Sequence, residues 1–318
     1  MNLGIVGTGN IVNECLKAIT EIKEIKCTSI VCREQSIQNA NLLAKEYDIA
    51  NVYTSYNEFL NNPDIDFVYI GIINNLHHEY TKQALLKGKH VICEKPFTAS
   101  YNELVELAEI AKKNNLFLFE AVTFLHSDNF KFLENNIDKI GPIKIIQCNY
   151  SQYSSRYDKY LENIVLPVFD PELAGGALYD INIYNLHFII YLFGMPKKMF
   201  YYKNAGFNKV DTSGIAVLEY KPFYASIVGA KDSHSTNFAM IQGEQGYIKV
   251  NGAVNVCAEI ELSIKNNIEK FSANRFKSRM GEEFYSFNKM FEESNLTECY
   301  RFLDHSLNVM KAIDVLHL

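Results

Sequence analysis

The feature that most constrains the fold is a glycine turn between a short apolar run and an amphipathic helix near the N-terminus. Residues 3–6 read LGIV, which is a β-rich run, and residues 7–9 read GTG. Apolar residues then recur at helical spacing over residues 11–22. A strand, a Gly-x-Gly turn and a helix in this order are typical of the first half of a dinucleotide-binding βαβ unit.

The turn itself has the residue types that a pyrophosphate requires. The first glycine permits the tight turn, and the second lets the backbone approach the phosphates. Backbone N–H groups at the start of the helix then face the anion. The third position of the fingerprint is Val12 rather than glycine or alanine, so we expect a slightly wider contact between helix and strand. The residues expected to contact the dinucleotide here are Gly7, Thr8, Gly9, Asn10 and Ile11.

The end of the second expected strand, residues 27–31, bears on the choice between NAD and NADP. A carboxylate at this point would bind the ribose 2′-hydroxyl of NAD. Cys32 stands in that place and Arg33 follows it, while Glu34 is a competing carboxylate one position further on. Because an arginine can pair with a 2′-phosphate through two hydrogen bonds, we favour NADP over NAD.

The alternation of strands and helices continues to about residue 120. Uniformly apolar strands separated by helices indicate a parallel sheet that is covered on both faces. We therefore expect a Rossmann domain, a doubly wound parallel sheet, over residues 1–121. The further strands are expected at 67–72, 91–93 and 116–119, and the helices at 38–47, 79–87 and 101–113.

The second part of the chain has a different pattern. Strand-like runs follow one another with no room for a helix between most of them, which indicates mainly antiparallel pairing. We expect a second domain of the α+β class over residues 122–318, with a large open sheet. Its strands are expected at 143–150, 198–203, 214–220, 224–230, 238–242, 247–250 and 258–264, and its helices at 128–136, 177–192 and 296–316.

Composition excludes several classes of protein. The net charge is −6 with no basic segment, so no nucleic-acid partner is expected. The apolar runs are shorter than the ~20 residues of a membrane helix. Seven cysteines without CxxC spacing indicate free thiols rather than a metal site. The N-terminus shows no secretory signal pattern, so we expect a cytoplasmic protein.

Four ordered motifs make the chain resemble the glucose–fructose oxidoreductase, inositol dehydrogenase and MocA family (Gfo/Idh/MocA). Residues 74–77 read NNLH and residues 88–96 read GKHVICEKP. Residues 120–121 read EA, and residues 175–184 read GGALYDINIY. In the family these motifs follow the fourth, fifth and sixth strands and then open a helix of the second domain.

The resemblance implies a cofactor site and an assembly. It adds contacts from the turns after the fourth and fifth strands, with His77 an equal candidate for capping its helix. It also implies that helix 296–316 returns to the first domain, and that the second sheet forms a homodimer or homotetramer interface. The cofactor contacts added in this way are Ile72, Asn74, His77, Glu94 and Lys95.

Hydride transfer from a hydroxyl group needs a residue that moves its proton and a charge near the developing oxygen anion. Lys95 follows a buried strand, at the sheet edge where ligands of such domains bind. Asp180 and Tyr184 are four residues apart and share one helix face. By resemblance Tyr184 is the acid and base, while Lys95 and Asp180 orient the substrate. His187 is a secondary candidate.

These observations predict an oxidoreductase that moves a hydride between a nicotinamide cofactor and a sugar, polyol or similar small substrate. Residues 122–126 read VTFLH and Asn182 replaces a common family glycine, so no individual relative's substrate is adopted. Two alternatives stay open: a non-catalytic NADP-sensing regulatory protein, and a glycosidase or lyase that uses NAD transiently.

Overall fold

The computed structural model describes residues 1–265, 267–273 and 275–317, which form two compact units. Unit 1 contains Met1–Ala121 and Arg275–Leu307, and unit 2 contains Val122–Asn274 and Asn308–Leu318. The segment 275–307 lies in unit 1, although we expected the second domain to span 122–318. Its part from residue 296 on belongs to the helix that we expected to return to the first domain. No helix in the described part of the chain is long and apolar enough to cross a bilayer.

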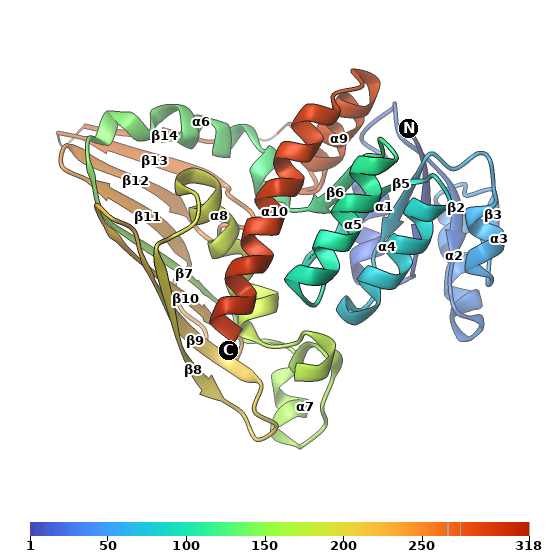
Figure 1. The fold of residues 1–318 in the computed structure, drawn as a ribbon, viewed down its shortest axis with the longest axis horizontal. Helices are drawn as coiled ribbons and strands as arrows, with labels where there is room; N and C mark the ends of the chain where they lie inside the picture. The colour runs from blue at the N-terminus through green and yellow to red at the C-terminus, as the bar shows by residue number, and fades with distance from the viewer. Residues whose placement is uncertain (266, 274, 318) are drawn as a thin grey trace. The chain divides into compact units, whose positions relative to one another are not determined.

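Unit 1 is built on a parallel sheet of six strands in the order β3-β2-β1-β4-β5-β6 (Figure 1). This is the strand order of a doubly wound dinucleotide-binding fold, as the sequence predicted. The strands are β1 (Asn2–Val6), β2 (Lys26–Val31), β3 (Asn51–Tyr53), β4 (Phe67–Ile70), β5 (His90–Glu94) and β6 (Leu118–Ala121). The helices are α1 (Asn10–Ile19), α2 (Ile37–Glu46), α3 (Tyr56–Leu60), α4 (His77–Leu86), α5 (Tyr101–Lys113), α9 (Gly281–Glu292) and the first part of α10 (Leu296–His317).

The core of unit 1 combines side chains from its two chain segments, 1–121 and 275–307. Buried residues of β1, α1 and α2 form one hydrophobic cluster with residues of α9 and α10. Phe287 of α9 stacks on Phe119 of β6 with ring centroids 4.4 Å apart. Cys299 of α10 donates a hydrogen bond to the Leu118 carbonyl at 3.6 Å. The short strand β3 and helix α9 were not predicted. β3 has only three residues, and the apolar residues of α9 pack on strands that lie far away in sequence.

Unit 2 is built on a sheet of eight strands in the order β14-β13-β12-β11-β7-β10-β9-β8. Its strands are β7 (Ile143–Ser151), β8 (Lys198–Ala205), β9 (Asp211–Glu219), β10 (Tyr224–Ala230), β11 (Phe238–Gly243), β12 (Gly246–Asn251), β13 (Glu259–Ile264) and β14 (Asn267–Phe271). Its α-helices are α6 (Asp128–Asn136), α7 (Tyr157–Leu161), α8 (Ile183–Phe193) and the end of α10. A π-helical segment, Leu178–Asn182, immediately precedes α8.

The pairing is antiparallel throughout this sheet except at its centre, where β7 and β10 are parallel. We expected antiparallel pairing wherever no helix fits between consecutive strands. That rule applies to neighbours in sequence, such as β8, β9 and β10. It does not apply to β7 and β10, because the long segment between them, which includes α7 and α8, permits a crossover.

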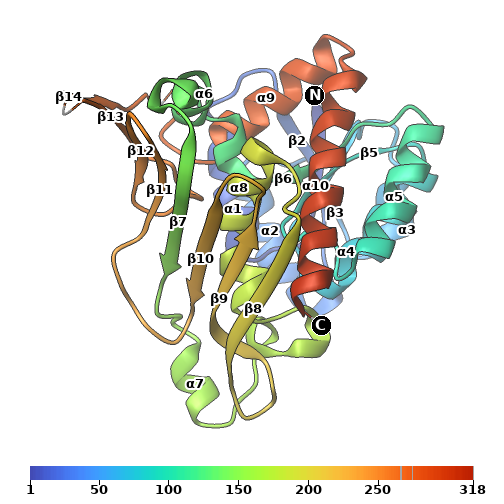
Figure 2. The same cartoon turned by 60° about the vertical axis from the view of Figure 1, so that its left-hand side comes forward.

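The two faces of the sheet differ. The π-helical segment and α8 pack against β7, β9 and β10 on one face. Figure 2 shows the strands β7, β10, β9 and β8 from the other side, with no described helix of unit 2 in front of them. Four large side chains on neighbouring strands of this outer face are exposed: Phe200 at 49%, Tyr202 at 68%, Ile215 at 47% and Tyr224 at 58%.

Candidate active site

The glycine turn has the geometry that a pyrophosphate needs. Gly7 has φ +108°, and a Cβ there would lie 2.6 Å from the Gly71 carbonyl oxygen, so only glycine fits. A Cβ at Gly9 would meet no atom within 4 Å, so this side of the turn is open. Gly9 caps α1 without a side-chain hydrogen bond, and the first helical amides have no acceptor within the helix. The residues present therefore fit a dinucleotide phosphate group.

The valine at the third fingerprint position is accommodated by a glycine on the neighbouring strand end. Val12 is fully buried, and a Cβ at Gly71 would lie 3.0 Å from its Cγ2. The same Cβ would lie 3.2 Å from Cγ2 of Ile11. Gly71 thus provides the space that the fingerprint normally obtains from a small residue in α1.

The end of β2 presents an arginine and no carboxylate at the expected position. Cys32 is 8% exposed, and its amide donates to the Tyr53 carbonyl at 3.0 Å. Arg33 is exposed and precedes a short 3₁₀ turn that begins at Glu34. Asn39 of α2 donates to the Thr8 carbonyl at 3.0 Å, which connects this region to the glycine turn.

The turn after β4 is connected to the turn after β5 by a buried histidine. His77 is fully buried, with Nδ1 2.8 Å from the Pro96 carbonyl and Nε2 3.1 Å from the Ile72 carbonyl. Burial lowers the pKa of His77, although both carbonyl contacts act in the opposite direction. The ring therefore holds two turns together within unit 1. Contact of Asn74, Ile72 and His77 with a cofactor stays a prediction.

Glu94 belongs to a buried polar group inside unit 1. Its side chain is 7% exposed, and Oε1 accepts a hydrogen bond from the Tyr69 hydroxyl at 2.7 Å. Glu283 of α9 is fully buried, and in the described part of the chain neither of its carboxyl oxygens has a hydrogen-bond partner. Burial raises the pKa of Glu94, and burial followed by repulsion from Glu94 raises the pKa of Glu283 well above its usual value.

Lys95 directly follows β5, and its side chain is half-buried. The Lys95-Pro96 peptide bond is cis, as is often found in the family that the chain resembles. The cis bond lies beside the Pro96 carbonyl that contacts His77. Lys95 lies in unit 1, whereas Asp180 and Tyr184 lie in unit 2.

In unit 2, Asp180 lies in the π-helical segment and Tyr184 in the first turn of α8. We expected one regular helix over 177–192; the structure instead has a wider turn over its first residues. Such turns are rare and often occur at functional sites. The Asp180 side chain is 31% exposed, whereas Tyr184 is 7% exposed. The ring centroids of Tyr184 and Tyr150 are 6.0 Å apart. His187 is fully buried in the same helix.

Asp180 forms an ion pair with a lysine that the sequence analysis did not identify. Lys231 is 1% exposed, and its Nζ lies 2.7 Å from Asp180 Oδ2. A lysine is rarely so deeply buried unless its charge is paired. The signal that could have identified it was available, because Lys231 directly follows the apolar run 224–230, just as Lys95 follows its own strand.

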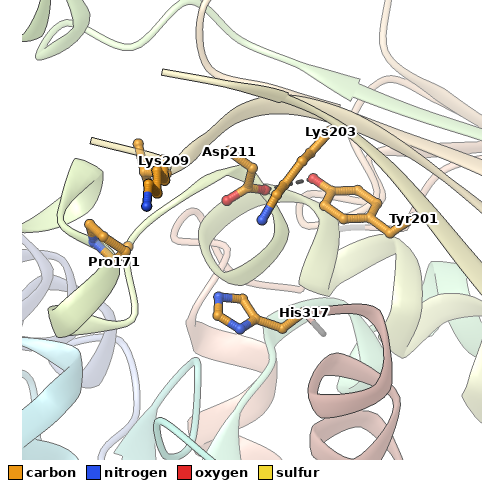
Figure 3. Close-up of a pocket in the computed structure, with 8 residues that line it drawn as sticks. Pro171, Tyr201, Lys203, Lys209, Asp211 and His317 are labelled. Atoms are coloured by element: carbon orange, nitrogen blue, oxygen red, sulfur yellow. Dashed lines mark hydrogen bonds between the residues drawn. The ribbon is translucent and has the colours of Figure 1, made fainter. Parts of the chain in front are cut away.

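A second carboxylate holds the start of the π-helical segment. Asp211 accepts hydrogen bonds from the Leu178 amide at 2.7 Å and from the Tyr201 hydroxyl at 2.6 Å. Burial raises the pKa of both Asp211 and Tyr201. Figure 3 shows the hydroxyl of Tyr201 directed at Asp211, with Lys203 beside them. Gly176 has φ +112°, and a Cβ there would collide with Asp211 Oδ1.

Sequence comparisons find related proteins along almost the whole chain. Residues 1–122 match a model described as an oxidoreductase family with an NAD-binding Rossmann fold. Residues 137–249 match the GFO/IDH/MocA C-terminal domain. The chain is 31% identical to a scyllo-inositol 2-dehydrogenase (NADP(+)) of Bacillus subtilis, covering 99% of this chain and 95% of that protein. It is 26% identical to a D-xylose 1-dehydrogenase (NADP(+)) of Haloferax volcanii, covering 100% and 96%.

A solved structure has the same fold. A 3-ketoreductase from Actinomadura kijaniata, in complex with NADP and TDP-benzene, aligns with a TM-score of 0.88. The alignment covers 100% of this chain and 97% of that one at 20% identity. At this identity the likeness concerns the fold alone, which includes both the parallel and the mainly antiparallel sheet.

Proposed function

The chain belongs to the GFO/IDH/MocA oxidoreductase family, and from this premise we propose that it transfers a hydride between NADP and a sugar or polyol. The observation that carries the proposal is the start of α1, where Gly9 leaves open space and adds no side-chain cap. This is the arrangement that an anionic dinucleotide needs.

The residues that would hold the cofactor lie at the carboxyl ends of the parallel strands. The backbone of residues 7–11 would bind the pyrophosphate, and Arg33 the 2′-phosphate. The turn that contains Ile72 and Asn74 and the end of β5 at Glu94 would border the nicotinamide part. The bound cofactor supplies the hydride donor or acceptor.

Three side chains would act on the substrate. Tyr184 would take the proton from the reacting hydroxyl in oxidation and return it in reduction. Lys95 would stabilise negative charge on the substrate oxygen. Asp180 would accept hydrogen bonds from the hydroxyl groups of the substrate and orient them.

NADP is the proposed cofactor on two independent grounds. Arg33 is exposed at the end of β2, where it can reach a 2′-phosphate, and Cys32 offers no carboxylate for a 2′-hydroxyl. The two relatives described above carry NADP(+) in their names. Their names also support a polyol or sugar as the substrate class, of which inositol and xylose are the first to test.

The experiment is a panel of cyclic polyols and aldoses assayed with NADP and NAD at 340 nm. Turnover with one cofactor and at least one panel member is expected. Tight cofactor binding without turnover across the panel would favour the NADP-sensing alternative. Product formation without net change in absorbance would favour transient use of the cofactor by a glycosidase or lyase. Either result would overturn the proposed reaction.

We also propose that two copies associate through the outer face of the unit 2 sheet. Four exposed side chains lie on three neighbouring strands: Phe200 and Tyr202 on β8, Ile215 on β9 and Tyr224 on β10. A monomer would leave these apolar and aromatic groups in water. A second copy related by a twofold axis would cover the same residues on both partners. Light scattering should give the molar mass of a dimer or tetramer, and Ile215→Asp should lower this molar mass.

The thiols support a cytoplasmic setting. All seven cysteines are free and buried, which suits a compartment that keeps thiols reduced.

A further inference from the structure

We propose that Lys231 is a positioning residue that holds the Asp180 carboxylate in the place where it meets the substrate. The inference rests on the proposed function, because it takes Asp180 as a substrate contact. Nζ of Lys231 lies 2.7 Å from Asp180 Oδ2, and both residues belong to unit 2. They are separated by 51 positions in the sequence, so no local motif links them.

The backbone of Lys231 is fixed on both sides. Its amide donates to the Thr212 carbonyl at 2.9 Å, and its carbonyl accepts from the Ser154 amide at 2.8 Å. These partners lie at the start of β9 and just after β7. Because the lysine backbone is attached to both, its side chain begins from a rigid position.

The ammonium group has two further contacts that fix its direction. Nζ donates to the Val168 carbonyl at 2.8 Å and lies 4.6 Å from the centroid of the Phe169 ring. The Val168 carbonyl also accepts a hydrogen bond from the Gly176 amide at 3.1 Å. The ammonium therefore connects Asp180 to the glycine turn that opens its helix.

The two partners differ in their access to solvent. The side chain of Lys231 is 2% exposed, whereas that of Asp180 is 31% exposed. A dissolved substrate can reach the carboxylate but not the ammonium group. Lys231 must therefore act through Asp180, which distinguishes it from a catalytic residue.

The first test replaces the lysine by a side chain of similar length without charge. Lys231→Met should lower kcat/KM roughly 100-fold, since small displacements of an orienting group have losses of this order. The dissociation constant for NADPH should stay within about threefold, because the ion pair lies outside the predicted cofactor contacts. Lys231→Arg, which keeps the charge, should recover at least part of kcat/KM.

A double-mutant cycle separates positioning from a general structural role. If Lys231 acts through Asp180, Lys231→Met should add less than about threefold to the loss in Asp180→Asn. Multiplied losses would overturn the proposal, as would a folded Lys231→Met with kcat/KM within threefold of wild type. If Lys231→Met alone does not fold, Asp180→Asn and the double variant still decide, because both lack the ion pair.

Lys89→Met is the matched control. Nζ of Lys89 donates to the Asn62 and Ile65 carbonyls, both at 2.8 Å. Lys89 precedes β5, at the opposite end of this strand from Lys95. It reports the effect of losing two lysine hydrogen bonds to carbonyl groups without a carboxylate. Its kcat/KM should remain near the wild-type value.

Wild-type turnover is measured first, because its absence would count against the proposed function and not against Lys231. In that event crystal structures of wild type and Lys231→Met decide. The Asp180 carboxylate should turn away from the Val168 carbonyl in the variant. An unchanged carboxylate would overturn the positioning role.

Discussion

The two units hold their predicted functional groups in different ways. In unit 1 the turn at Gly7–Gly9 presents backbone, and its shape depends on glycines that leave space. In unit 2 Asp180 lies in a π-helical segment that Lys231 and Asp211 hold through buried charged hydrogen bonds. A site of backbone groups tolerates changes of nearby side chains, whereas a site held by side chains depends on each partner in turn.

The largest expected effect concerns Lys95, the side chain of unit 1 that we propose acts on the substrate. The cofactor site of this unit otherwise presents mainly backbone groups. Lys95→Ala should lower kcat roughly 1,000-fold, about 4 kcal/mol, because it removes the charge that we propose stabilises the reacting oxygen. The NADPH dissociation constant should change by less than about tenfold. Near-normal kcat in steady-state kinetics would remove Lys95 from the site, with Lys89→Ala as the control.

The next effect compares a glycine from each unit. Gly176→Ala should reduce the free energy of unfolding by about 3 kcal/mol, because its φ is +112° and its Cβ would collide with Asp211. Gly9→Ala should cost less than about 1 kcal/mol, since its Cβ meets open space, yet it should weaken NADPH binding. Chemical denaturation measures the first quantity and fluorescence titration the second. Equal losses of stability in the two variants would contradict the proposed difference between the two glycines.

A buried carboxyl group in unit 1 gives a pH-dependent effect of intermediate size. Burial raises the pKa of Glu283 in the folded protein well above 4.5, its value in the unfolded chain. At pH values between the unfolded and the folded pKa, the folded protein therefore binds one proton more than the unfolded chain. The stability contributed by the protonated form is fully present below pH 4.5 and is lost as pH rises through the folded pKa.

Glu283→Gln should therefore become more stable than wild type as pH rises. The difference in free energy of unfolding should grow by about 1.4 kcal/mol per pH unit in this window. Denaturation at pH 5, 6, 7 and 8 measures it. A constant difference would show that Glu283 does not titrate on unfolding.

The smallest expected effect concerns the cofactor preference. Arg33→Ala should raise the NADPH dissociation constant about tenfold, or about 1.4 kcal/mol, and leave that of NADH nearly unchanged. Equal changes for both cofactors would contradict the proposed 2′-phosphate contact and would make Cys32 and Glu34 the residues to examine next.

Local patterns predicted most of unit 1 from the sequence. The glycine turn and the buried parallel strands have strong signals in sequence, and each strand and helix predicted up to residue 121 has a counterpart there, although β3 and α3 were not predicted. Helix α9 was missed because it packs on the N-terminal sheet from more than 150 positions away in sequence. Its apolar residues, such as Phe284 and Phe287, find their packing partners only in the folded sheet.

The sequence singled out Asp180 and Tyr184 as candidate site residues of unit 2, but not the residues that hold them in place. Asp180 and Tyr184 belong to a recognisable motif, whereas Lys231 directly follows a strand and Asp211 begins one, without either belonging to a motif. Their partners lie 51 and 33 positions away, and only the tertiary structure brings them together. Glu283 was missed for the same reason, because a glutamate in a helix is usually exposed.

The division of unit 1 into Met1–Ala121 and Arg275–Leu307 has a consequence for synthesis in the cell. The ribosome releases the six-stranded sheet first, when Met280, Phe284, Phe287 and Cys299 of its core have not yet been made. All of unit 2 as far as β14 emerges before these side chains do. The nascent sheet must therefore keep an apolar face without its final cover for nearly half of translation. In vivo, chaperone demand and truncation sensitivity should concentrate in that interval.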